Sequence, residues 1–227
     1  MPSEARRRMT LWILVAHIAV LGYWLGSELV INSTYRYVCF ADNMPFTERT
    51  RLMDHVMHVD QHVRYALVLQ TSLGIVLAAN YGFIPGGAPV AFAAAAFGIL
   101  WLGFVEAVHR LRKHEAGPLL GKIDRVSRYI LMAVLLATSL SLIGGAWPMP
   151  GWLRWKLAAF TGVMACGVGI RFALIAHFRT WAQMAASGVT PERNALIRAT
   201  YVQATAVLVL LWVFIGVIVW LSIAKPV

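Results

Sequence analysis

Apolar residues are concentrated in six long stretches of the chain, separated by short polar or turn-forming segments. A helix needs about 20 consecutive apolar residues to cross the hydrocarbon core of a bilayer. The stretches lack the apolar–polar alternation of half-buried strands. They therefore predict an all-α, polytopic integral membrane bundle, a single transmembrane domain of residues 1–227. We expect transmembrane helices at about residues 9–31, 63–83, 89–109, 129–147, 157–177 and 200–223.

Turn-forming residues mark the ends of several predicted spans. The segment NYGFIPGGAP divides the second span from the third, and GGAWPMPGW divides the fourth from the fifth. In SGVTPER, Gly188 is expected to end one helix, with Thr190 as the N-cap and Pro191 as the first residue of the next. A strip of Gly162, Cys166 and Gly169 predicts a close helix contact in the fifth span.

The composition supports a membrane protein. Hydrophobic residues make up 59% of the chain and charged residues only 13%, whereas soluble domains carry roughly a quarter charged residues. The net charge of +10 comes from basic residues in the loops, so it suits anionic lipid headgroups and predicts no nucleic acid partner. Cys39 and Cys166 are expected to be free thiols, and the apolar N-terminal segment is expected to be a retained first span.

The Lys and Arg residues predict the orientation. The loops after spans one, three and five hold twelve of them, and the other side holds six. Because basic loops stay in the cytoplasm, both termini are expected outside. The cytoplasmic side also carries polar helix extensions. The segment after Pro45 has no helix breaker, so one long helix is expected to rise through it into the second span.

Three histidines lie in that extension. On a helix, His55, His58 and His62 fall within an arc of roughly 60°. One interpretation is a helix start exposed to water; the other is a metal site or a source of haem ligands. We expect this face to point inward. Asp60 and Arg64, four residues apart on the opposite face, are expected to form an ion pair.

Other ionisable residues lie near the same ends of the predicted spans. Ionisable groups inside a bilayer are costly and usually face the bundle interior. They are candidate ligands for iron, copper or zinc, or partners in interhelical hydrogen bonds. The Glu-x-x-His spacing of two of them is typical of dimetal bundles, although only one such motif is present. The candidates are Glu28, Glu106, His109 and His177.

The first span carries a second pattern. His17, Trp24 and Glu28 lie on one stripe of the helix, and Gly26 leaves room for a neighbour or a flat ligand. The order His, six residues, Trp and then Gly resembles two small bacterial membrane families, the copper-resistance D family and the membrane protoporphyrinogen oxidase. The resemblance implies haem b bound by His17, with Trp24 and Gly26 beside it, in a bacterial inner membrane. Arg171 is expected to snorkel towards the interface or to pair with a carboxylate or a haem propionate.

These patterns lead to three hypotheses. The first is a b-type haem redox protein that exchanges electrons with a quinone or a partner dehydrogenase. The second is a Glu/His dimetal membrane oxidoreductase. The third is a proton- or metal-coupled transporter or channel, in which the Glu and His residues bind the ion in transit.

Overall fold

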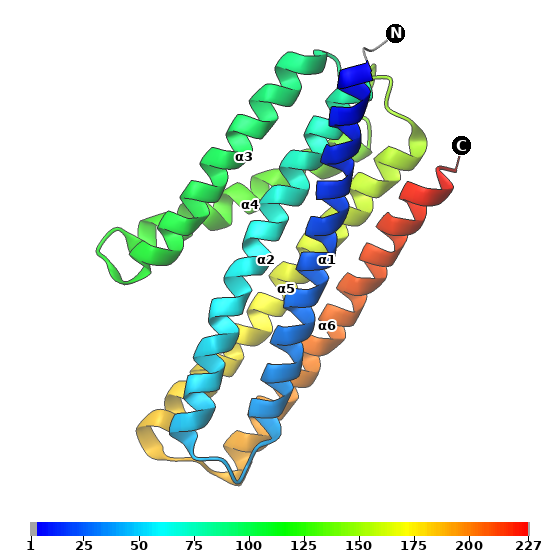
Figure 1. The fold of residues 1–227 in the computed structure, drawn as a ribbon. Coiled ribbons are helices and arrows are strands. Elements are labelled where there is room, and N and C mark those ends of the chain that lie inside the picture. The colour runs from blue at the N-terminus through cyan, green and yellow to red at the C-terminus, as the bar shows by residue number, and fades with distance from the viewer. Residues whose placement is uncertain (1–3, 227) are drawn as a thin grey trace. The chain divides into compact units, whose positions relative to one another are not determined.

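The structure, a computed structural model, describes residues 4–226. These residues form an all-α protein, which confirms that part of the predicted fold class. The helices are α1 (Glu4–Phe40), α2 (Phe46–Asn80), α3 (Gly87–Arg110), the short 3₁₀ helix η1 (Leu111–Lys113), α4 (Gly117–Ser139), α5 (Gly151–Ser187) and α6 (Pro191–Ala224) (Figure 1).

Five of the helices are long and apolar enough to cross a membrane: α1, α2, α3 with η1, α5 and α6. Inside lipid, a helix satisfies all of its central backbone groups through its own hydrogen bonds, and this is why apolar stretches of this length fold as helices. Helices α1, α2, α5 and α6 are much longer than the predicted spans, so the extensions that the sequence predicts are helical, whereas α3 is close to its predicted length. In particular, α2 is the single long helix expected after Pro45.

The predicted fourth span is wrong in its extent. It was expected over residues 129–147, but α4 ends at Ser139 and is followed by a turn segment in which Ser141 and Gly144 have positive φ angles of 64° and 66°. Eleven helical residues from Tyr129 reach about 16 Å, roughly half of a bilayer core. The remainder of α4 carries Lys122, Asp124, Arg125 and Arg128, and α4 is not among the five apolar helices.

The predicted boundary between the last two helices is confirmed. Gly188 follows the end of α5 with a φ of 85°, a left-handed conformation that suits glycine. The Thr190 side chain accepts a hydrogen bond from the Arg193 backbone N–H at 3.3 Å, and Pro191 begins α6. Both cysteines are free thiols, as expected.

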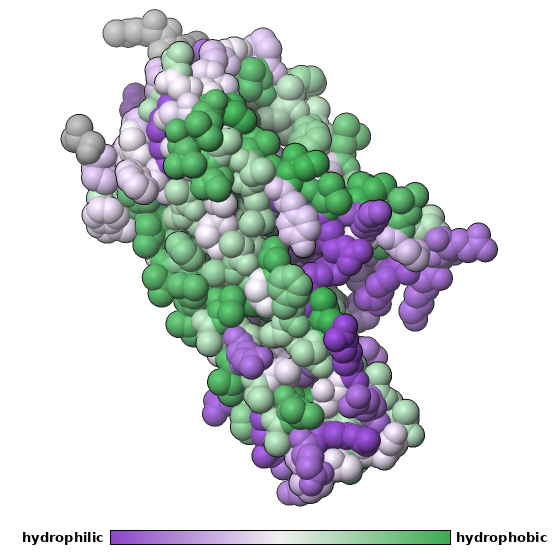
Figure 2. Space-filling view, turned by 180° about the vertical axis from the view of Figure 1, so that it is seen from behind, coloured by the Kyte–Doolittle hydropathy of each residue, from purple (hydrophilic) through white to green (hydrophobic). Residues whose placement is uncertain are grey.

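The chain divides into two compact units. Unit 1 comprises residues 4–28, 59–131 and 142–150. In it, α3 packs along the second half of α2. Near one end, Val76 and Ala79 of α2 pack with Ala91 and Ala94 of α3. Further along, Val68 of α2 packs with Trp101 and Val105 of α3. Figure 2 shows hydrophilic side chains gathered at the turn between α3 and α4.

Unit 2 comprises residues 29–58, 132–141 and 151–226. Helices α5 and α6 run side by side (Figure 1). Small residues of α5 permit this approach, because a Cβ added at Gly162 would lie 2.8 Å from the Phe214 ring, and one at Gly169 would lie 3.3 Å from Val207. The predicted small-residue contact is therefore confirmed. Hydrophilic side chains gather at the end of unit 2 that carries the connection from α5 to α6 (Figure 2).

Candidate functional site

Polar side chains of three helices form a row in unit 1, here called the polar row: Tyr23, His62, Tyr65, Glu106 and Arg110. The Tyr23 hydroxyl lies 2.5 Å from Nδ1 of His62. The Tyr65 hydroxyl donates to one oxygen of the Glu106 carboxylate, and Nε of Arg110 donates to the other. Between the two pairs, the His62 and Tyr65 rings meet edge-on with 6.1 Å between their centroids. The row therefore joins α1, α2 and α3.

Helix periodicity explains the order of the row. His62 and Tyr65 are three residues apart on α2, and Glu106 and Arg110 are four apart on α3, so each pair shares one helix face. On this face of α2, His62 contacts Tyr23 of α1, and Tyr65 contacts Glu106 of α3. All of the groups except Arg110 can gain or lose a proton in ordinary chemistry.

A buried carboxyl lies five residues after Tyr23 on α1. Glu28 is 8% exposed and accepts a hydrogen bond from the Trp24 indole N–H at 3.2 Å, and Trp24 is itself buried. This pairing follows from the i,i+4 spacing on the predicted stripe. The carboxyl is held by a neutral donor on its own helix.

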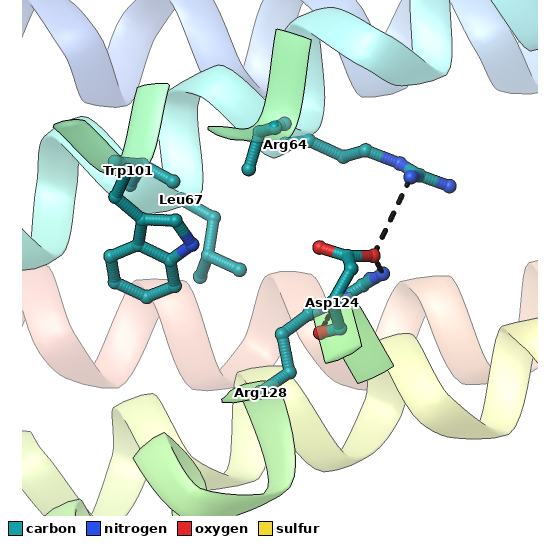
Figure 3. Close-up of a pocket in the computed structure, with 7 residues that line it drawn as sticks. Arg64, Leu67, Trp101, Asp124 and Arg128 are labelled. Carbon is teal, nitrogen blue, oxygen red and sulfur yellow. Dashed lines mark hydrogen bonds and ion pairs between the residues drawn. The ribbon is translucent and has the colours of Figure 1, made fainter. Parts of the chain in front are cut away.

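A second polar group in unit 1, here called the charge ladder, contains Asp60, Arg64, Asp124 and Arg128. Arg64 pairs with Asp60 at 3.2 Å, as the sequence predicts, and with Asp124 at 3.7 Å. Arg128 also binds the Asp124 carboxylate. Figure 3 shows the two guanidinium groups converging on Asp124. Two cations and two anions balance, so the charge ladder ties α4 to α2 without a net charge.

The space within the charge ladder is too small for a substrate. The pocket lined by Arg64, Trp101, Asp124 and Arg128 has a volume of about 10 Å³. A single water molecule needs roughly that much room. We therefore interpret the charge ladder as a structural anchor for α4.

Unit 2 holds a buried arginine. Arg49 is 1% exposed, donates from Nε to the Val38 carbonyl at 3.1 Å and from Nη1 to the Asn194 side chain at 3.0 Å, and lies over the Trp181 ring at 5.4 Å. Val38 is in the last turn of α1, where carbonyls lack helical partners and where a cation is favoured by the helix dipole. Arg49 thus fastens the end of α1 to the starts of α2 and α6.

His177 is the most deeply buried histidine of unit 2, at 0% exposure. Its Nδ1 lies 3.2 Å from the Thr200 hydroxyl, and that hydroxyl donates its only proton to the Ile197 carbonyl. Nδ1 must therefore be the donor, which leaves the lone pair on Nε2. The Tyr35 and Trp181 rings enclose the imidazole. His177 is thus held as a neutral core residue.

The prediction that His55, His58 and His62 point inward is wrong. All three side chains are exposed, and the buried positions of this part of α2 are Met53, Val56 and Gln61. The physical reason is that Met53, Val56 and Gln61 occupy the other side of α2 and fill the core, which leaves the histidines exposed. His62 nevertheless has a polar partner, the Tyr23 hydroxyl.

The other predicted site residues lie in varied surroundings. The His17 ring lies against α2, because a Cβ at Gly74 would be 3.7 Å from its Cε1. Gly26 is exposed, and an added Cβ there would meet no atom within 4 Å. His109 and Arg171 are half-buried. Within residues 4–226, no three His, Cys, Asp or Glu side chains lie close enough to hold a metal ion. Haem and metal binding stay predictions.

Several polar residues of these clusters were not predicted. Tyr23 and Tyr65 resemble ordinary interface aromatics in the sequence, and no local pattern assigns their partners. Arg49 did carry a signal. Met53 follows it by four residues and Val56 follows Met53 by three, so the three residues share one buried face of the helix. The i,i+4 spacing of the acidic and basic partners in α4 was a similar signal.

Replacing Asp124 with asparagine should destabilise the protein. Asn keeps the shape but removes the charge that two partly buried arginines share, and hydrogen bonds to charged groups contribute about 1.5–3 kcal/mol each. We expect the melting temperature in detergent to fall by about 4–8 °C. Asp54→Asn, at an exposed position of α2, is the matched control. Equal melting of the two variants would show that the charge ladder does not anchor α4.

No family model matches the chain, and neither the curated proteins nor the solved structures contain a significant match.

Proposed function

We propose that this protein is a membrane transporter or channel that conducts protons, and that the polar row carries the proton. The observation that supports this proposal is the presence of two hydrogen-bonded pairs, Tyr23 with His62 and Tyr65 with Glu106, on helices that are otherwise apolar enough to cross a membrane. Ionisable groups on such helices are costly, and in membrane proteins they mark proton and ion paths.

The depth of the row fits this role. Tyr23 lies about 21 Å along α1 from Met9, where the apolar stretch begins, and Glu106 lies about 28 Å along α3 from Gly87. The row therefore belongs near one boundary of the hydrocarbon core. At such a position, groups that exchange protons can pass them between water and a buried acceptor such as Glu28.

The chemistry of the row supports a stepwise transfer. His62 shares a proton with the Tyr23 hydroxyl, and Glu106 shares one with Tyr65. The step between the His62 and Tyr65 rings has no direct hydrogen bond in the structure and requires a bridging water or a side-chain rotation. Arg110 holds the far oxygen of Glu106 and thereby orients the carboxylate.

Proton flux into liposomes that contain the purified protein should depend on the row. His62→Gln and Glu106→Gln keep hydrogen-bonding groups of similar size but cannot exchange a proton at the same pH. We expect each to reduce flux by about tenfold or more, because a positioned acid or base commonly contributes 10²–10⁴ to a rate. The flux is measured with a pH-sensitive dye in the lumen.

Glu4→Gln is the matched control, since Glu4 is an exposed carboxylate that pairs with Arg8 on α1. It should leave the flux unchanged. If the control and the two variants conduct equally, or if the wild-type protein conducts no better than empty liposomes, the transport proposal is wrong.

A b-type haem redox protein is the second candidate. The observation that favours it is the position of the His17 imidazole. His17 lies on an apolar helix, and Gly74 of α2 has no side chain, so the imidazole ring can lie against α2. We expect the purified protein to show a Soret band that sharpens on reduction, and His17→Ala to lose most of it. His114→Ala, in the segment after η1, is the control and should keep the band. A colourless wild-type preparation from haem-replete cells would exclude this candidate.

We further propose that the protein lies in a bacterial inner membrane with both termini on the periplasmic side, as the Lys and Arg count suggests. This orientation requires six spans, with the whole of α4 rather than residues 129–147 as the fourth. Single cysteines at Pro148 and Ala116 test this, because both positions are exposed and the native Cys39 and Cys166 are buried. A membrane-impermeant thiol reagent should label the cysteine at position 148 of intact spheroplasts and not the one at 116.

The reverse labelling pattern would overturn the orientation. Labelling of both positions, or of neither unless the membrane is broken, would place them on one side and show that α4 does not cross the membrane.

A further inference from the structure

A hollow of about 550 Å³ lies in unit 2 between the first turns of α5 and the last turns of α6. Figure 1 shows these two helix ends beside each other. The volume is within the range of roughly 300–1,000 Å³ that is typical of ligand sites. Its walls are apolar and aromatic, and they include Trp152, Trp155, Ala158, Phe214, Val217 and Trp220. We call this hollow the tryptophan groove.

Residue size explains why the tryptophan groove exists. Ala158 of α5 lines the groove with a methyl group only, whereas Trp152 and Trp155 of α5 and Trp220 of α6 line it with large rings. Trp155 and Trp220 remain 70% and 58% exposed. Exposed indoles near the ends of apolar helices are typical of the interface between lipid and water, where the ring meets acyl chains and the N–H stays near headgroups. The groove therefore opens towards lipid.

Cations lie at the same end of unit 2. The Lys225 ammonium lies 6.0 Å from the Trp152 ring centroid, directly after α6 ends, and Arg154 and Lys156 follow Trp152 on α5. Residues 132–187 and 193–226 contain no Asp or Glu. Lys225 thus gives the Trp152 end of the groove a positive charge, and these segments carry no acidic side chain to neutralise it.

We propose that the tryptophan groove binds one acyl chain of an anionic glycerophospholipid from the surrounding membrane, with the lipid phosphate beside Lys225. The apolar walls extend for about 10 Å along each helix, a length that takes part of an acyl chain and excludes its polar headgroup. The charge selects the headgroup. A zwitterionic lipid fills the groove equally well but gains less from Lys225, which contributes about fivefold in affinity for an anionic lipid. This inference does not depend on proton transport.

Native mass spectrometry of the full chain, purified in detergent and mixed with phosphatidylglycerol or phosphatidylethanolamine of the same acyl composition, tests the site. The wild type should retain one phosphatidylglycerol at several-fold higher occupancy than phosphatidylethanolamine. Lys225→Gln should lose most of that preference. Ala158→Trp, which fills the groove and leaves the cations in place, should reduce the occupancy of both lipids.

Lys122→Gln is the matched control, since Lys122 is an exposed lysine on α4 outside unit 2. It should bind as the wild type does, and all variants are first checked for wild-type melting. Equal retention of the two lipids, or unchanged binding in both Lys225→Gln and Ala158→Trp, would overturn the proposal. Displacement of bound lipid by a short-chain quinone at equimolar concentration would assign the groove to a quinone and also overturn it.

Discussion

The pairing of polar side chains carried by apolar helices is the constraint on which the rest of this structure depends. A charged or hydroxyl group left without a partner away from water costs more than a typical hydrogen bond contributes, so such groups must meet within the protein. In unit 1, the Tyr65–Glu106 and Arg64–Asp124 contacts meet this requirement across three helices. They fix how α2 faces α3 and α4, which apolar packing alone leaves poorly specified, since lipid and leucine are equally apolar.

Unit 2 follows the same rule with different chemistry. Arg49 satisfies the last turn of α1 and the first turn of α6, and its charge lies on an indole face rather than on a carboxylate. His177 satisfies one nitrogen through Thr200 and is enclosed by aromatic rings. Both residues stay where water is excluded, and both serve the packing of helix ends. Tyr23 and His62 of the polar row in unit 1 are instead exposed, and this contrast is why we assign the proposed transport chemistry to the row.

Most of the fold could be predicted from the sequence, because long apolar stretches, a Thr-Pro helix start and the breaker after α2 act locally. The extent of the fourth span could not, since a run of apolar residues from Tyr129 hid the turn that begins after Ser139.

The contacts of the candidate site were harder to predict than the fold. Asp60–Arg64 follows from helix spacing, but the Tyr23–His62 pair joins residues 39 positions apart and depends on helix packing. The direction of the histidine face failed for a related reason: three histidines share one face, but spacing alone does not say which face is buried.

The central claim is that hydrogen-bonded pairs of the polar row act as units in proton transfer. A double-mutant cycle on proton flux, with Tyr65→Phe, Glu106→Gln and both changes together in liposomes, tests it most directly. If the hydroxyl and the carboxylate pass the same proton, removing either member disables the pair, so the double variant should conduct no more slowly than the worse single variant. Strictly multiplicative losses, or a Tyr65→Phe variant that conducts as the wild type does, would contradict the account.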